Sequence, residues 1–209
     1  MIIDAPYISQ RGAYPTGCEA VSTVMALRHA GVGISVDQFI DGCLPLGPAP
    51  AVGVGEGSGS GLPVGADPHE AFPGNPRQTN GWGCYATAIE IALSAVATAY
   101  DSSLAWRNVT GWELGSLCRR YVAAGIPVLV WATIDMAQPP LSVEATWVTP
   151  AGRRIEWLSP EHCLLLVGYD KDGYYFHDPL AGPAVPYAKP AVRAAYDALG
   201  RQALAIHPS

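Results

Sequence analysis

The chain has 209 residues, of which 49% are hydrophobic and 14% charged, and its formal net charge is −6. This composition is typical of a globular protein with a sizeable core and excludes an intrinsically disordered chain. The negative charge and the absence of Lys or Arg runs argue against nucleic acid as a partner, and no apolar run approaches the ~20 residues of a membrane span. We expect a single domain over residues 1–209 and a monomer.

The first predicted helix covers the segment "TGCEAVSTVMALRHAG". Thr16 is expected as its N-cap and Glu19 as the third helical residue, which together would form a capping box and put Cys18 near the second helical position. The same Ser/Thr-x-x-Glu/Gln pattern predicts the start of two further helices, at Ser35 with Gln38 and at Thr110 with Glu113.

A Gly- and Pro-rich insertion occupies about 43–82 and includes "GVGEGSGSGLPVG". Such length without periodicity is unusual inside a compact domain. Two interpretations stay open: a surface insertion, or a loop that borders an active site. A buried helix is predicted next, over residues 83–100, because this segment is rich in Ala and largely apolar.

The second half of the chain predicts strands. Residues 126–134 form an apolar run, and the segments 141–150, 153–159, 162–170 and 173–179 either alternate or are apolar throughout, with turn signals between them. A last helix over 190–200 and a last strand over 202–206 follow. Helices first and antiparallel strands second is an α+β pattern.

Cys18 is the candidate nucleophile. A helix N-terminus favours a thiolate through its free N–H groups and dipole, and the adjacent Gly17 leaves room for a substrate backbone. Glu19 opposes ionisation, but the capping box would engage its carboxylate. The other cysteines are Cys43, Cys84, Cys118 and Cys163. They read as buried hydrophobes, with a Cys43–Cys84 disulfide as an alternative if the protein is exported.

His162 and Asp178 are the candidate base and its orienting acid. His162 opens one predicted strand and Asp178 ends the next, so a hairpin would bring them together. The two side chains share a face of the sheet only if the numbers of two residues paired across the hairpin have an even sum. A three-residue loop 171–173, with Gly173 left-handed, gives such a sum and is therefore predicted. A two-residue loop would separate them. Gln10 is the candidate oxyanion donor, together with the Cys18 N–H.

Several blocks occur in one order across nearly the whole chain: "YISQ…YPTGCEAVS", "DPHEAFPGNP", "GWGCYATAI", "GIPVLVWAT", "EHCLLLVGYD" and "YYFHDPLAG". Together they resemble the bacterial C39-like peptidase family of the papain-like cysteine peptidase superfamily. The resemblance implies a papain-like fold, with an N-terminal helical half packed against a C-terminal antiparallel sheet and an active site between them. It also implies a triad of Cys18, His162 and Asp178, with Gln10 as the oxyanion-hole glutamine.

The resemblance further implies a peptide or protein substrate, a thiol-dependent hydrolysis through an acyl-enzyme, and no metal or organic cofactor. An extracellular or cell-envelope location is the family's implication, but the N-terminus "MIIDAPYISQ" has no visible signal peptide, so a cytoplasmic location stays open. Trp82, Trp131 and Trp157 are candidates to line the cleft, although core packing is expected for at least two of them.

The sequence allows four other interpretations. The first is a zinc site, but the Cys and His spacings match no zinc template. The second is a phosphate-binding loop in "GVGEGSGSG", but this segment lacks the Lys-Ser/Thr ending. A non-catalytic cell-envelope binding module on the same fold is the third. An acyl transferase or amidase acting on peptide or cell-wall amides is the fourth, because it would use the same residues.

Overall fold

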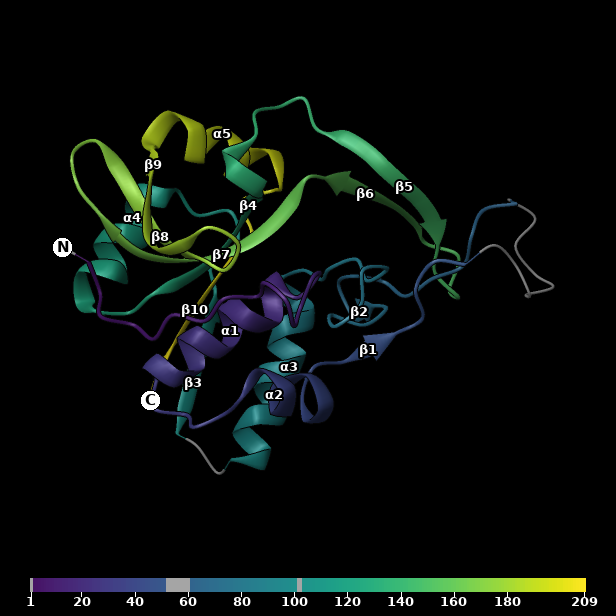
Figure 1. Cartoon of the computed structure of the whole chain (residues 1–209), viewed down its shortest axis with the longest axis horizontal. Helices are drawn as coiled ribbons and strands as arrows, with labels where there is room; N and C mark the ends of the chain where they lie inside the picture. Colours follow the sequence, from purple (N-terminus) through teal and green to yellow (C-terminus); the bar gives the residue numbers. More distant parts are fainter. Residues whose placement is uncertain (1, 52–60, 101–102) are drawn as a thin grey trace.

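A computed structural model describes residues 2–51, 61–100 and 103–209. Three helices gather on one side of a six-stranded sheet: α1 (Cys18–His29), α2 (Val36–Gly42) and α3 (Ala86–Ala99). A two-stranded hairpin extends from the sheet as an arm toward the insertion (Figure 1). The predicted division into a helical half and a sheet half, and the α+β class, are therefore confirmed.

The main sheet is antiparallel throughout. Its strand order is β3 (Leu104–Asn108), β10 (Ala203–Pro208), β4 (Val128–Thr133), β7 (Glu161–Tyr169), β8 (Gly173–Asp178) and β9 (Gly182–Ala188). Strand β4 is buried at every position because α1 packs on one side of the sheet and α5 (Lys189–Ala198) on the other (Figure 1). This explains its continuous apolar run, "VLVWAT".

Helix α1 is the central helix of the fold. Its residues from Cys18 to Leu27 are all buried, so it is covered on every side rather than amphipathic. The Ser22 hydroxyl donates a 3.0 Å hydrogen bond to the Cys163 carbonyl, which fixes α1 against β7. The first turn of α1 is thereby held beside the first residues of β7.

One of the two other predicted capping boxes is correct. Ser35 caps α2 and exchanges hydrogen bonds with Gln38 in both directions, as expected. Helix α4 (Leu114–Arg120) has Glu113 as its N-cap, without a side-chain cap. Thr110 instead accepts the Ala203 N–H at 3.3 Å, so its hydroxyl supports β10 rather than the helix.

The arm and the insertion are joined. Strands β5 (Ser142–Val148) and β6 (Arg154–Ser159) form the arm, and β1 (Leu46–Gly47) pairs in parallel with β2 (Phe72–Pro73) inside the insertion. A parallel bridge joins Val64 of the insertion to Val148 of β5. The segment "GVGEGSGSG", which lacks the ending of a phosphate-binding loop, lies almost entirely outside the described residues.

Strands β1, β2, β3 and β9 were not predicted. The remaining short elements are the 3₁₀ turns η1 (Val122–Ala124) and η2 (Ile134–Met136). All five cysteines are unpaired, so the alternative Cys43–Cys84 disulfide is absent. No helix within the described part of the chain is long and apolar enough to cross a membrane.

Candidate active site

Cys18 is the first residue of α1, one position earlier than predicted, because Gly17 rather than Thr16 is the N-cap. A side chain at Gly17 would bring its Cβ within 2.8 Å of the Tyr14 Cβ and 3.2 Å of the Pro76 Cβ. Only glycine therefore fits this close approach. The Thr16 hydroxyl donates instead to the Gln78 carbonyl at 3.0 Å, which ties the start of α1 to the insertion.

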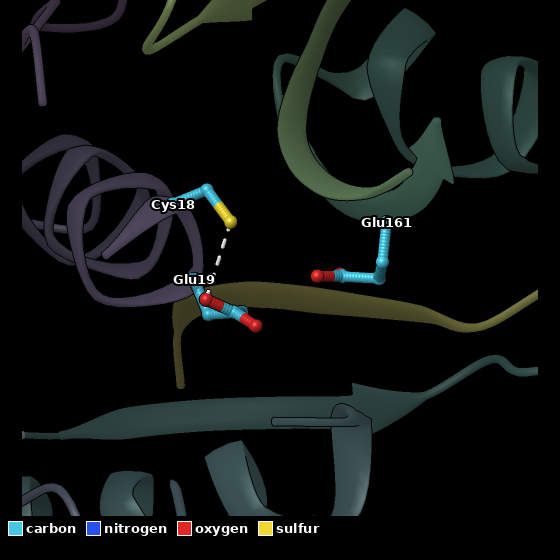
Figure 2. Close-up of side chains that lie close together, drawn as sticks. All are labelled: Cys18, Glu19 and Glu161. Atoms are coloured by element: carbon cyan, nitrogen blue, oxygen red, sulfur yellow. Dashed lines mark hydrogen bonds between the residues drawn. The ribbon is translucent and has the colours of Figure 1, made fainter. Parts of the chain in front are cut away.

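The predicted capping box at Glu19 is wrong. Glu19 is fully buried, and its Oε1 accepts the Cys84 N–H at 2.7 Å, whereas its Oε2 accepts the Cys18 thiol at 3.2 Å (Figure 2). A second carboxyl group, Glu161 of β7, approaches from the opposite side (Figure 2). The thiol sulfur and one oxygen of each carboxyl group lie within 4.8 Å of one another. Among the described residues, this group comes nearest to a metal-binding arrangement.

The environment of Cys18 opposes its ionisation. Burial raises the pKa of the Cys18 thiol well above its usual value, and the nearby Glu19 and Glu161 raise it further. Burial also raises the pKa of both carboxyl groups, which keeps protons within the cluster. In this conformation, burial and the negative neighbours therefore oppose the thiolate that the helix N-terminus was expected to favour.

His162 and Asp178 form the predicted pair. The His162 Nε2 lies 2.9 Å from the Asp178 Oδ1, and both side chains are buried. The Tyr187 hydroxyl donates to Asp178 Oδ2 at 2.7 Å, and the Leu180 N–H donates to Oδ1 at 2.8 Å. Burial alone would raise the pKa of Asp178, but the hydrogen bonds from His162, Tyr187 and Leu180 outweigh it and lower this pKa to about 2. Asp178 is therefore a carboxylate that is hydrogen-bonded to the His162 ring.

The hairpin that joins His162 to Asp178 differs from the prediction. The Asp170 N–H donates to the Gly173 carbonyl, which closes a two-residue loop, and Gly173 is not left-handed. Near the turn the paired numbers have an odd sum, as in Tyr169 with Tyr174. A register shift between Leu166 and Gly168 then restores an even sum, as in Leu165 with His177. A β-bulge, and not the loop, puts His162 and Asp178 on one face.

Gln10 is buried, and its side-chain amide is engaged with the backbone. The Nε2 donates to the Tyr14 and Pro15 carbonyls at 3.3 Å each, while no described residue donates to the Oε1. The Gln10 N–H donates to the Pro179 carbonyl at 3.0 Å, which connects this loop to the end of β8. The oxyanion role of Gln10 stays a prediction, since its donor now faces carbonyl oxygens.

One cavity of about 530 Å³ brings three of the four candidates together. Gln10, Cys18 and His162 line it, whereas Asp178 lies behind His162. Trp82 and Trp157 also line the cavity, but Trp131 is fully buried and donates to the Cys84 carbonyl. The insertion contributes six of the lining residues, so it borders the candidate site: Ala49, Pro50, Thr79, Asn80, Gly81 and Trp82.

A triad with His162 as the base would put the Cys18 sulfur within hydrogen-bond reach of the His162 ring. Among the described residues no such hydrogen bond is formed, and the thiol donates to Glu19. Sequence reasoning missed Glu161 as its neighbour. Side chains alternate along a strand, so in "EHC" the side chains of Glu161 and Cys163 share one face of β7 and His162 takes the other. Because His162 was expected to face Cys18, this alternation would have directed Glu161 away from the thiol, so the sequence contained no sign of the contact.

The helical half, the antiparallel sheet and the cavity between them define a papain-like fold of the cysteine peptidase class. The chain belongs to the Peptidase_C39 like family, whose model matches residues 2–204. It is 25% identical to a Bacillus anthracis protein whose crystal structure is provisionally described as that of a C39-like peptidase. That match has a TM-score of 0.76 and covers 98% of this chain and 96% of the other.

A further relative is the uncharacterized protein YvpB of Bacillus subtilis (strain 168). The two sequences are 26% identical over 192 residues, which is 91% of this chain and 68% of YvpB. Family and fold together support a function of the peptidase type.

Proposed function

We propose that this protein is a thiol-dependent peptidase that hydrolyses peptide bonds through an acyl-enzyme on Cys18. The observation that carries the proposal is the His162–Asp178 pair, which shares a cavity with a cysteine at a helix N-terminus. Asp178 is ionised, so its Oδ1 can only accept the hydrogen bond that joins it to His162 Nε2. The neutral His162 ring therefore carries its proton on Nε2, and its Nδ1 is the nitrogen that can act as the base.

In the proposed reaction, His162 accepts the thiol proton at Nδ1 and the Cys18 sulfur attacks the substrate carbonyl carbon. The Cys18 N–H and the Gln10 amide stabilise the oxyanion. The leaving amine takes the proton from His162, and a water molecule, deprotonated by the same ring, then hydrolyses the thioester. Two rearrangements are needed: the sulfur turns from Glu19 toward His162, and the Gln10 Nε2 leaves the Tyr14 and Pro15 carbonyls.

Replacement of the nucleophile tests the proposal. Cys18→Ala should lower hydrolysis of a peptide library by at least roughly 10⁴-fold, because no other group can form the acyl-enzyme. Cys43→Ala is the matched control: Cys43 lies at the end of α2, outside the cavity, and should retain the wild-type rate. Unchanged peptide hydrolysis by Cys18→Ala would disprove the proposed acyl-enzyme mechanism.

A non-catalytic peptide-binding module is the second candidate function. It is favoured by the protonated resting state of Cys18 and by the engaged amide of Gln10. Wild type and Cys18→Ala would then bind peptides from the library with equal affinity, and neither would hydrolyse them. Measurement of binding by calorimetry beside hydrolysis by mass spectrometry separates the two functions.

A further inference from the structure

We propose that Glu19 is a positioning residue, which holds the Cys18 thiol protonated and turned away from His162, and that Glu161 completes this resting arrangement. The inference rests on the proposed function, since the direction of the thiol matters only if Cys18 is the nucleophile. Neither carboxyl group touches the reacting atoms of a substrate in this scheme. They act through the sulfur.

Glu19 is held rigidly. Its Oε2 accepts the thiol at 3.2 Å, and its Oε1 accepts the buried Cys84 N–H at 2.7 Å. The Cys84 carbonyl in turn accepts the indole N–H of Trp131 at 2.8 Å, which fixes this segment to β4. Glu19 cannot turn aside without leaving the buried Cys84 N–H unpaired, which is unfavourable. A displacement of the thiol is therefore easier than a displacement of its acceptor.

Glu161 closes the other side of the cluster. It stands next to His162 in β7, and the strand alternation directs its side chain to the face of α1. Its Oε1 is buried without a hydrogen-bond partner among the described residues. A Cβ added at Gly83 would contact Glu19 and would lie 3.0 Å from Glu161 Oε2 and 2.8 Å from the Trp157 ring. The backbone at Gly83 thus covers both carboxyl groups closely.

Within the described structure, no cation that would favour ionisation faces this cluster. The other titratable groups that face it are Cys163 on β7, Cys84 and Tyr85 before α3, and each is neutral or negative. His162 neighbours Glu161, but its Nε2 is engaged with Asp178. Burial raises the pKa of the thiol and of both carboxyl groups, which agrees with a sulfur that keeps its proton.

Glu19→Gln is the sharpest change. Glutamine keeps the size of the side chain and a carbonyl oxygen for the Cys84 N–H, while its amide can donate to a thiolate. The negative neighbour becomes a donor, so Cys18 should ionise at a lower pH. Glu161→Gln removes a more distant charge and should act in the same direction to a smaller degree.

The experiment measures the rate of Cys18 alkylation by iodoacetamide in the whole chain, from about pH 6 to about pH 10, with each cysteine followed by mass spectrometry. The thiolate sulfur forms a bond to the iodoacetamide carbon, iodide leaves, and the thiol proton passes to solvent. We expect Glu19→Gln to lower the midpoint by about one pH unit, which is about tenfold faster labelling below the wild-type midpoint. Glu156→Gln, an exposed position of β6, is the matched control and should keep the wild-type midpoint.

An unchanged midpoint in a folded Glu19→Gln protein would overturn the inference. If Glu19→Gln fails to fold, the same measurement is made on Glu161→Gln. An unchanged alkylation midpoint in that variant would also overturn the inference. Labelling needs no turnover, so this result is separate from the proposed function. A shifted midpoint in a protein that hydrolyses no peptide would support the positioning role and remove the peptidase.

Discussion

At the scale of single residues, the proposed chemistry depends most directly on the contact between His162 and Asp178. The Asp178 carboxylate is hydrogen-bonded to the His162 Nε2 at 2.9 Å, and it also accepts hydrogen bonds from the Tyr187 hydroxyl and the Leu180 N–H. These three hydrogen bonds fix the carboxylate, and the fixed carboxylate favours one orientation and one tautomer of the imidazole. An amide at position 178 would keep the shape of the side chain but would offer one acceptor atom instead of two.

Asp178→Asn should therefore lower kcat by ~10²–10⁴-fold, because the ring would lose its preferred tautomer and the stabilisation of its charged form. Steady-state kinetics on a cleaved library peptide measures this. Asp172→Asn is a suitable control, since Asp172 is exposed in the β7–β8 loop and its change should stay within about 0.5 kcal/mol of stability. A kcat for Asp178→Asn equal to that of the control would contradict the assigned role.

At the scale of elements, the start of α1 decides where the sulfur lies. Gly17 is the N-cap, and its Cα faces Tyr14 and Pro76 at a distance that leaves no space for a methyl group. Thr16, one residue earlier, is tied to the insertion through the Gln78 carbonyl. The loop before α1 and the insertion therefore fix the first helical turn together.

Gly17→Ala should destabilise the protein by about 1–3 kcal/mol, because the added methyl group has to displace Tyr14 or Pro76. Gly33→Ala, just beyond α1, is the matched control: nothing lies within 4 Å of its added Cβ and its φ is not positive. Urea unfolding of both variants measures the difference. Equal stabilities would mean that the close approach at Gly17 is not strained by a methyl group.

The elements also show how far the sequence could predict the site. The pattern at Thr16 and Glu19 fits a capping box, but the Cys84 N–H, 65 residues away along the chain, takes the Glu19 carboxylate. The bulge between Leu166 and Gly168 has no recognisable signal in an apolar run. The predicted three-residue loop was therefore wrong, although the bulge still puts His162 and Asp178 on one face of the sheet. Strand β9 has prolines at two of its positions, which hid an edge strand from pattern analysis.

At the scale of the whole molecule, the helical half and the sheet half meet around two acidic side chains. Glu19 belongs to α1 and Glu161 to β7, and burial raises the pKa of both. The global features that the sequence predicted were the α+β class, the order of the halves and the position of Cys18 near their boundary. The acid pair across that boundary needed the packing of α1 on β7, which no local pattern contains.

This pair makes stability depend on pH. Above pH 4.5, the ordinary pKa of a glutamate, these two carboxyl groups lose their protons in the unfolded chain but still bind them in the folded chain. The free energy of unfolding therefore falls as the pH rises. We expect a lower Tm at about pH 8 than at about pH 5.5, with each 1 kcal/mol equal to about 2–4 °C. Asp178 does not contribute to this window because its lowered pKa acts below 3.8.

Calorimetric scans of wild type and Glu161→Gln at both pH values test this, and the variant should have the flatter dependence. His69, whose pKa is lowered by burial, acts with the opposite sign near 6.5 but is common to both proteins. Parallel curves for the two proteins would show that Glu161 does not bind a proton differentially on folding.

The wall of the cavity has an optical consequence. Trp82, Trp147 and Trp157 have ring centroids 5.4 to 6.3 Å apart, and two of these rings line the cavity. The Trp147 N–H donates to the Ala66 carbonyl at 2.9 Å, so the group joins the arm to the insertion. Indole emission reports the polarity around the ring. The molecule thus carries its own fluorescent sensor, because any ligand that enters the cavity would change the polarity around two of these indoles.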